Sequence, residues 1–238
     1  MLDLLNLDGK IAVVTGGAKG LGAATARMLE RAGAHVTVFD VELAGGRAVD
    51  VTSEQAVTEA MARVAQRSGG VDILVNNAGR VARKPAVDLS VEEWDAVLKL
   101  NLTATFVCSR AAHPYMKARG GGAIVNLASI MGLSGGLFPN ASYQASKGGV
   151  VNLTRALALE WASDNIRVNA VAPTFVNTEL TAQIFSNPEK LNTVMQHTPL
   201  GRLPDPDDVA AAILYLCSDA ARCVTGIVLP VDSGYLAR

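Results

Sequence analysis

KIAVVTGGAKGLG, residues 10–22, is the stretch that decides the fold. It opens on a short apolar run rich in β-branched residues, which is typical of a buried strand in a parallel sheet. Glycines follow, and residues 23–32 are rich in alanine, which favours a helix. Glycines let a backbone approach a pyrophosphate closely, and a helix N-terminus offers free N–H groups. The stretch therefore predicts a strand, a dinucleotide-binding turn and a helix, although a glycine turn without a ligand has the same spacing.

The second predicted strand, residues 35–39, ends at Asp40. A carboxylate there accepts hydrogen bonds from the adenosine ribose and repels a 2′-phosphate, which favours NAD over NADP. Lys19 in the glycine turn argues the other way, because its charge could meet a 2′-phosphate. We expect Asp40 to decide, since the lysine can turn to solvent. The plain alternative is a surface acid at a strand end.

Residues 41–49 form an unusually short connection between Asp40 and Asp50. Parallel strands joined through a helix need a crossover of a dozen or more residues. We therefore expect no full helix there, or a third strand that is nearly absent.

The rest of the chain alternates between the two kinds of element. Capping boxes at residues 52–55 and 90–93 predict helix starts. The pattern predicts an α/β fold, with one Rossmann-type domain over residues 1–238 and a doubly wound parallel sheet of about seven strands flanked by helices. The long segment at about 174–203 predicts a substrate lid. Further strands are predicted at residues 71–75, 123–127, 167–172 and 227–231.

The composition excludes several classes of function. The 238 residues carry a net charge of −1 without long basic runs, so nothing predicts binding to nucleic acid or to an anionic membrane. No apolar run reaches the ~18 residues of a membrane span, and the acidic start differs from a secretory signal. We expect a cytoplasmic protein. Cys108, Cys217 and Cys223 are widely spaced, which predicts buried free thiols and no metal site.

Tyr143 and Lys147 are four residues apart, so on a helix their side chains share one face. A phenol with a pKa of ~10 is a poor base at neutral pH, and a nearby ammonium group lowers that pKa. Ser129 follows the predicted strand 123–127, at the end where open α/β sheets place their ligands. The pair by itself is weak evidence, and a tyrosine packed on a lysine stem is its plain alternative.

Several motifs together resemble those of the short-chain dehydrogenase/reductase family, over nearly the whole chain. Each motif alone is weak, but their shared order and spacing make a chance similarity very improbable. They are Thr15-Gly16-x-x-x-Gly20-x-Gly22, Asn76-Asn77-Ala78-Gly79, Asn101, Ser129, Tyr143-x-x-x-Lys147 and the segment 173–178.

This resemblance implies an active site of Ser129, Tyr143 and Lys147, with Asn101 as a fourth member. Tyr143 would exchange a proton with the substrate oxygen while hydride moves between substrate and nicotinamide. Lys147 would hold the nicotinamide ribose and lower the tyrosine pKa, and Ser129 would hydrogen-bond the reacting oxygen. Asn101 would hold a water in a proton relay, although a buried asparagine bonded to backbone is its plain alternative. Members of the family are usually homotetramers.

The residues expected to contact NAD come from the glycine turn and from the resemblance together. Asp50 and Val51 are the least supported, because the connection before them is short. The full set is Thr15, Gly16, Lys19, Gly20, Leu21, Gly22, Asp40, Asp50, Val51, Asn77, Ala78, Gly79, Tyr143, Lys147, Pro173, Val176 and Thr178.

The chain departs from the family pattern at three places. Tyr143 follows Ser129 by 14 positions, one more than in most relatives. Thr174 follows Pro173 where glycine is usual, and Ser233 also occupies a usual glycine position. None of these changes removes a catalytic group.

We expect an NAD-dependent oxidoreductase that interconverts a secondary alcohol and a ketone. Residues 197–202 and 231–238 look most like those of sugar, sugar-acid and polyol dehydrogenases. A 3-oxoacyl thioester reductase, which would prefer NADPH, is the alternative, and a catalytically silent NAD-binding sensor is the non-enzymatic one.

The predicted lid bears on the choice of substrate. Its charges balance, whereas a thioester reductase calls for a basic patch near its entrance. It is rich in small polar side chains, a few of which would suit a hydroxylated substrate. Leu133, Phe138 and Phe175 are expected to line the pocket. The polar lid residues are Asn177, Thr178, Thr181, Gln183, Ser186, Asn187, Asn192, Thr193, Gln196 and Thr198.

Overall fold

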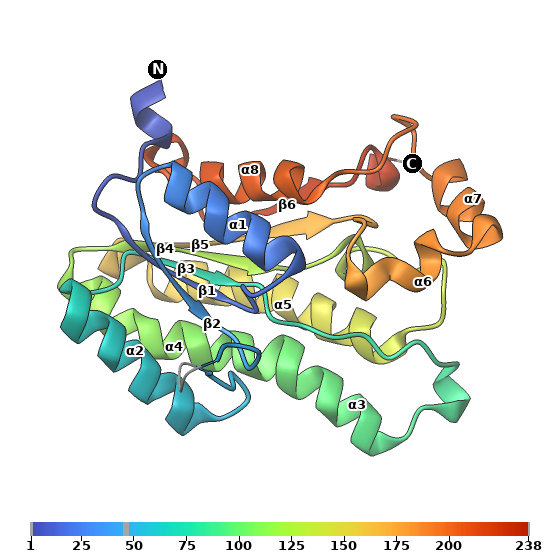
Figure 1. Ribbon diagram of the computed structural model, residues 1–238, viewed down its shortest axis with the longest axis horizontal. Coiled ribbons are helices and arrows are strands. Elements are labelled where there is room, and N and C mark those ends of the chain that lie inside the picture. Colours follow the sequence, from blue (N-terminus) through green and yellow to red (C-terminus); the bar gives the residue numbers. More distant parts are fainter. Residues whose placement is uncertain (1, 45–47, 238) are drawn as a thin grey trace.

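A computed structural model describes residues 2–44 and 48–237 of the chain. One parallel sheet of six strands, in the order β2-β1-β3-β4-β5-β6, forms its centre (Figure 1). This confirms the predicted single-domain, doubly wound α/β fold. The strands are β1 (Ile11–Thr15), β2 (His35–Phe39), β3 (Ile73–Asn76), β4 (Gly122–Leu127), β5 (Ile166–Pro173) and β6 (Val228–Val231).

The strand count is six rather than the expected seven, and the short connection after β2 explains the difference. The Val49 N–H donates to the Asp40 carbonyl at 3.0 Å, which turns the chain back at once. The side chains of Val49 and Val51 then pack into the core beside Val57. Residues 41–44 and 48–53 contain neither strand nor helix, as expected for the connection, while residues 45–47 lie outside the described part.

Helices cover both faces of the sheet (Figure 1). Residues of β1 alternate between two cores: Ile11 and Val13 pack on the side of α2, α4 and α5, and Ala12 and Val14 on the side of α1 and α8. The helices are α1 (Gly20–Arg31), α2 (Glu54–Ser68), α3 (Val91–Leu98), α4 (Ala104–Ala118), α5 (Ala141–Glu160), α6 (Ala182–Phe185), α7 (Pro188–Gln196) and α8 (Pro206–Cys217).

Side-chain caps fix where several helices begin. The Ser90–Glu93 capping box is present at α3. At α2 the cap is Ser53, one residue later than the motif suggests, and its hydroxyl accepts from the Ala56 N–H at 3.3 Å. Between α3 and α4 the chain passes through a π-helical segment, Lys99–Thr103, which contains Asn101.

A buried chain of polar side chains joins the ends of β3 and β4 to the helices beneath them. The Asn76 amide donates to the Ser109 hydroxyl and to the Asn126 side-chain oxygen, both at 2.9 Å. The Asn126 amide in turn donates to the Thr154 hydroxyl at 3.0 Å. Removing one partner would leave a buried polar group unsatisfied, which costs about 1–3 kcal/mol. These bonds therefore fix the strand ends relative to α4 and α5.

The described residues contain neither a helix that could span a membrane nor a cluster of metal-ligating side chains. None of the helices there is long and apolar enough to span a membrane. Within residues 2–44 and 48–237, no group of three or more His, Cys, Asp or Glu side chains is placed to hold a metal ion.

The three cysteines differ in environment. Cys108 and Cys217 are buried, as expected, but Cys223 is exposed, so the expectation of three buried thiols is wrong for that residue. Cys223 lies in a surface turn after α8. Because it is outside any helix or strand, no periodic pattern of apolar residues could have predicted its exposure from the sequence.

We predict that one thiol per chain reacts rapidly with Ellman's reagent in the native protein, and that all three react after unfolding. Burial raises the pKa of both the Cys108 and the Cys217 thiols to about 12, so neither offers a thiolate at pH 8. Cys223→Ser should abolish the rapid reaction. Two or more rapidly reacting thiols in the folded protein would contradict the assigned burial.

Candidate active site

The glycine turn between β1 and α1 fits an anionic group. Gly16 and Gly20 have φ angles of 63° and 57°, a left-handed conformation that favours glycine. A Cβ on Gly22 would lie 2.1 Å from the Gly16 carbonyl oxygen, so no larger residue fits there. Lys19 precedes α1 without capping it through its side chain. The first N–H groups of the helix are therefore left for a ligand such as a pyrophosphate.

Thr15 and Asn77 fasten this turn to the loop after β3. The Thr15 hydroxyl accepts from the N–H groups of Asn77 and Ala78 at 3.0 and 3.1 Å. The Asn77 amide donates to the carbonyls of Thr15 and Gly16 at 3.0 and 2.8 Å. Both side chains are thus occupied in holding backbone. They shape the cradle that residues 15–22 and 77–79 form together.

Asp40 lies beside the glycine turn, and its contact with an adenosine ribose stays a prediction. Its carboxylate accepts from the N–H groups of Ala18 and Glu42, both at 3.0 Å. The Lys19 ammonium pairs with Glu42 at 2.7 Å and with Glu179 at 2.8 Å, and these bonds raise its pKa. The lysine charge is therefore already balanced by two carboxylates. The edge of the turn presents more negative than positive charge.

Four other residues that were expected to bind the cofactor differ in how their side chains are placed. Thr178 faces the glycine turn, since a Cβ on Gly20 would lie 3.8 Å from its side chain. Val51 and Val176 turn their side chains into the core, and only their backbone remains for a ligand. The Asp50 carboxylate accepts from the N–H and hydroxyl of Thr52, both at 2.8 Å. Contact of Asp50 and Val51 with an adenine stays a prediction.

Ser129, Tyr143 and Lys147 converge beyond the C-terminal end of β4. Lys147 is 4% exposed, and its Nζ atom donates to the carbonyl of Leu127, the last residue of β4. The same Nζ lies 5.7 Å from the centroid of the Tyr143 ring, one turn earlier in α5. Ser129 is buried two residues past the strand, and its hydroxyl accepts from the Met131 N–H at 3.2 Å.

Burial shifts the pKa values of both titratable groups. Desolvation lowers the pKa of Lys147 to about 8. It raises the pKa of the Tyr143 phenol, and the Ser129 hydroxyl and the Arg83 guanidinium oppose that rise. We expected Lys147 to lower the phenol pKa, but the groups that lower it here are Ser129 and Arg83.

Asn101 is fully buried, and both N–H groups of its side-chain amide donate while its oxygen accepts one hydrogen bond. It donates to the Arg80 carbonyl at 2.9 Å and to the Ser146 hydroxyl at 3.0 Å, and its oxygen accepts from the Arg80 N–H at 2.9 Å. Two of these three bonds are to backbone atoms, which fits the alternative that Asn101 is a buried asparagine bonded to backbone. The side chain joins the loop after β3 to α5, and the surrounding π-helical segment marks a departure from regular bonding that is frequent at functional sites.

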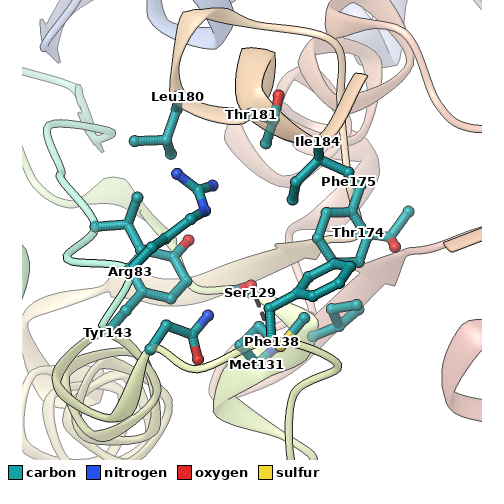
Figure 2. A pocket seen from close by; sticks show the side chains of 13 residues that line it. Arg83, Ser129, Met131, Phe138, Tyr143, Thr174, Phe175, Leu180, Thr181 and Ile184 are labelled. Atoms are coloured by element: carbon teal, nitrogen blue, oxygen red, sulfur yellow. Dashed lines mark hydrogen bonds between the residues drawn. The ribbon is translucent and has the colours of Figure 1, made fainter. Parts of the chain in front are cut away.

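An open cavity lies over Ser129 and Tyr143. Figure 2 shows the aromatic rings of Phe138 and Phe175 on one side and Arg83 on the other. The two phenylalanines were expected, whereas Leu133 is 38% exposed and does not line the cavity. Arg83 was missed in the sequence. Its position four residues past Gly79, in the loop at the end of β3, was the available signal.

Known dehydrogenases and reductases resemble this chain over nearly its whole length. A family model described as enoyl-(acyl carrier protein) reductase matches residues 16–236. The chain is 43% identical to a cis-4-hydroxycyclohexanecarboxylate dehydrogenase from Sinomonas cyclohexanicum, over 96% of this chain and 97% of the relative. It is 42% identical to a galactitol 2-dehydrogenase (L-tagatose-forming) from Cereibacter sphaeroides, over 98% and 97% of the two chains.

A solved structure shows the same fold. It is a gluconate 5-dehydrogenase from Burkholderia cenocepacia J2315 in complex with NADP and tartrate. That protein is 30% identical to this one, with a TM-score of 0.91 and coverage of 100% of this chain and 99% of the other. With its motifs, its fold and these relatives, the chain belongs to the short-chain dehydrogenase/reductase family.

Proposed function

We propose that the protein is an NAD-dependent oxidoreductase that interconverts a secondary alcohol and a ketone by hydride transfer. The main support is the convergence of Ser129 and Tyr143 at the cavity, with Lys147 buried beside the phenol ring, at the same C-terminal edge of the sheet as the glycine turn of residues 15–22. A sensor that only binds the cofactor would not need a buried lysine beside a phenol and a serine hydroxyl.

The residues of the turn and of the neighbouring loops would hold the cofactor. Its pyrophosphate would lie at the N-terminus of α1, and Asp40 would accept hydrogen bonds from the adenosine ribose. Segments 77–79 and 173–178 would lie along the nicotinamide half, with Lys147 near its ribose. When bound, NAD accepts the hydride from the alcohol carbon, or NADH returns it to the ketone.

Tyr143 would move the proton at the reacting oxygen, and Ser129 would stabilise the charge that develops there by donating a hydrogen bond. Because burial lowers the pKa of Lys147 to about 8, this group can gain or lose a proton close to neutral pH. It would therefore link the phenol to a relay towards Asn101. Both N–H groups of the Asn101 amide already donate to the protein, so backbone atoms of Lys99–Thr103 would hold the relay water.

The proposal extends to the setting of the enzyme. Residues 174–203 would form a substrate lid, since Phe175, Ile184 and Val194 pack over Ile130 and Met131 at the cavity. A homotetramer would bury the large apolar side chains now exposed on the outer helices. These exposed side chains include Val91 of α3, Phe106 of α4 and Leu159 of α5, which are 69%, 37% and 83% exposed. A cytoplasmic location stays a prediction.

The substrate would be a small hydroxylated compound such as a polyol, a sugar or a sugar acid, in line with the names of the relatives. A relative described as a 3-oxoacyl-[acyl-carrier-protein] reductase from Thermotoga maritima, 38% identical over 97% of this chain, keeps the 3-oxoacyl thioester alternative open. The lid has two basic residues, Lys190 and Arg202, and two acidic ones, Glu179 and Glu189, so its charges balance. This balance argues against binding of a phosphate-bearing acyl carrier.

Tyr143→Phe should lower kcat by about 100-fold or more, because it removes the transferable proton and little else. NADH binding should be nearly unchanged, as measured by quenching of protein fluorescence. Activity is measured as NADH formation from a panel that includes cis-4-hydroxycyclohexanecarboxylate and galactitol. Tyr115→Phe, on α4 and away from the cavity, is the matched control. A Tyr143→Phe enzyme that keeps more than about a tenth of kcat would rule out the assigned role.

Asp40 should make NAD the preferred coenzyme, with Lys19 held by its two carboxylate partners. Asp40→Ser should lower kcat/KM for NAD by roughly 10- to 100-fold, because hydrogen bonds from the ribose to a charged group are lost, and should improve the use of NADP. The ratio of kcat/KM for the two coenzymes is the measurement, with Asp95→Ser on α3 as control. Preference of the wild type for NADP would refute the electrostatic assignment and favour the thioester alternative.

A further inference from the structure

Arg83 is the one charged side chain among the described residues that line the cavity. It lies in the loop between β3 and α3, and it is half-buried. In Figure 2 its guanidinium extends across the cavity wall between Tyr143 and Leu180. A cation therefore stands beside the phenol that would exchange a proton with the substrate.

Within residues 2–44 and 48–237, Arg83 makes no ion pair and no side-chain hydrogen bond. Other cations near it behave differently: Lys84, the next residue, pairs with Glu93, and Lys19 pairs with Glu42 and Glu179. An arginine stays charged even when partly buried, and its planar fork suits a carboxylate. A half-buried guanidinium without a partner is therefore placed to receive an anion from outside the chain.

The rest of the wall is mostly apolar. Phe138 and Phe175 meet edge to face with their ring centroids 6.0 Å apart, and Met131 and Ile184 lie beside them. In such surroundings, with little competing water, an ion pair is stronger than at an exposed surface. These walls suit the carbon skeleton of a substrate that carries few hydroxyl groups.

The polar lid residues give little support to a heavily hydroxylated substrate. Of the ten, Thr181 alone lines the cavity among the described residues, and its hydroxyl already donates to the Val176 carbonyl. Others bond within the lid, as Thr193 does to Glu189 and Thr198 to Val194. Thr174 remains: its hydroxyl is buried at the cavity without a partner and offers one further polar contact.

We propose that Arg83 binds the carboxylate of the substrate, and that the substrate is a small hydroxy acid with a largely apolar skeleton rather than a neutral polyol. This rests on the proposed function, in which Ser129 and Tyr143 receive the hydroxyl of the same molecule. The carboxylate would hold the molecule by one end, the aromatic wall would contact its skeleton, and the secondary alcohol would then lie at the phenol.

Kinetics with matched substrates test this directly. The wild type should oxidise cis-4-hydroxycyclohexanecarboxylate with a kcat/KM roughly 10- to 100-fold above that for the corresponding carboxamide, which has the same shape without the charge. Arg83→Gln should bring that ratio close to one, mainly through a higher KM for the acid, and Arg83→Lys should restore part of it. Arg67→Gln, which removes the same charge from the exposed end of α2, should leave the ratio unchanged.

A binding measurement separates this inference from the proposed function. Cyclohexanecarboxylate, which has no hydroxyl to oxidise, should bind the NADH-loaded wild type in calorimetry and bind Arg83→Gln at least about 10-fold more weakly. Thermal melting of each variant checks that it is folded. Failure of the proposed function would appear as no NADH formation from any alcohol while this binding difference persists.

Equal binding by wild type and Arg83→Gln, or a wild type that oxidises acid and carboxamide equally well, would overturn the inference and leave the oxidoreductase assignment standing. Inorganic phosphate that competes as well as the carboxylate would point to a phosphate-bearing substrate and would also overturn it.

Discussion

The site depends on one buried contact, the hydrogen bond from the Lys147 ammonium to the carbonyl of Leu127. Burying a charged group is unfavourable unless it is bonded, so this contact holds α5 against the end of β4. Tyr143 lies one turn earlier on the same helix face, and Ser129 follows Leu127 by two residues. One bond therefore holds together three side chains from two parts of the chain, the end of β4 and α5.

The order of the strands brings this group to the glycine turn. β1 lies between β2 and β3, and β3 pairs with β4, so the C-terminal ends of these strands meet at one edge of the sheet. The chain adds β2 on one side of β1 and the later strands on the other, so the order of the strands reverses at β1. Open α/β sheets bind their ligands at such a reversal. The bonds between Thr15 and Asn77 then fix the turn relative to the loop after β3. That loop continues to Arg83, so one element borders both the turn and the cavity.

Local patterns in the sequence were sufficient for much of the fold and site. The first strand, the glycine turn and the Ser90 capping box depend on neighbouring residues, and the structure has them as predicted. The expected count of about seven strands was wrong, because Val49 and Val51 pack into the core from a loop and form no strand of the sheet. Arg83 and the polar lid residues could not be judged from sequence, since only the folded chain shows which side chains find partners. Exposure of Cys223 was missed for the same reason.

The proposed proton transfer through the phenol requires Lys147 to titrate close to neutral pH, and the deep burial of its ammonium group is what brings it there. The most direct test is an NMR titration of the Lys147 side-chain nitrogen in the free protein, with Lys147→Ala to assign the signal. We expect a pKa of about 8. A value at or above 10.5, the ordinary pKa of a lysine, would contradict it.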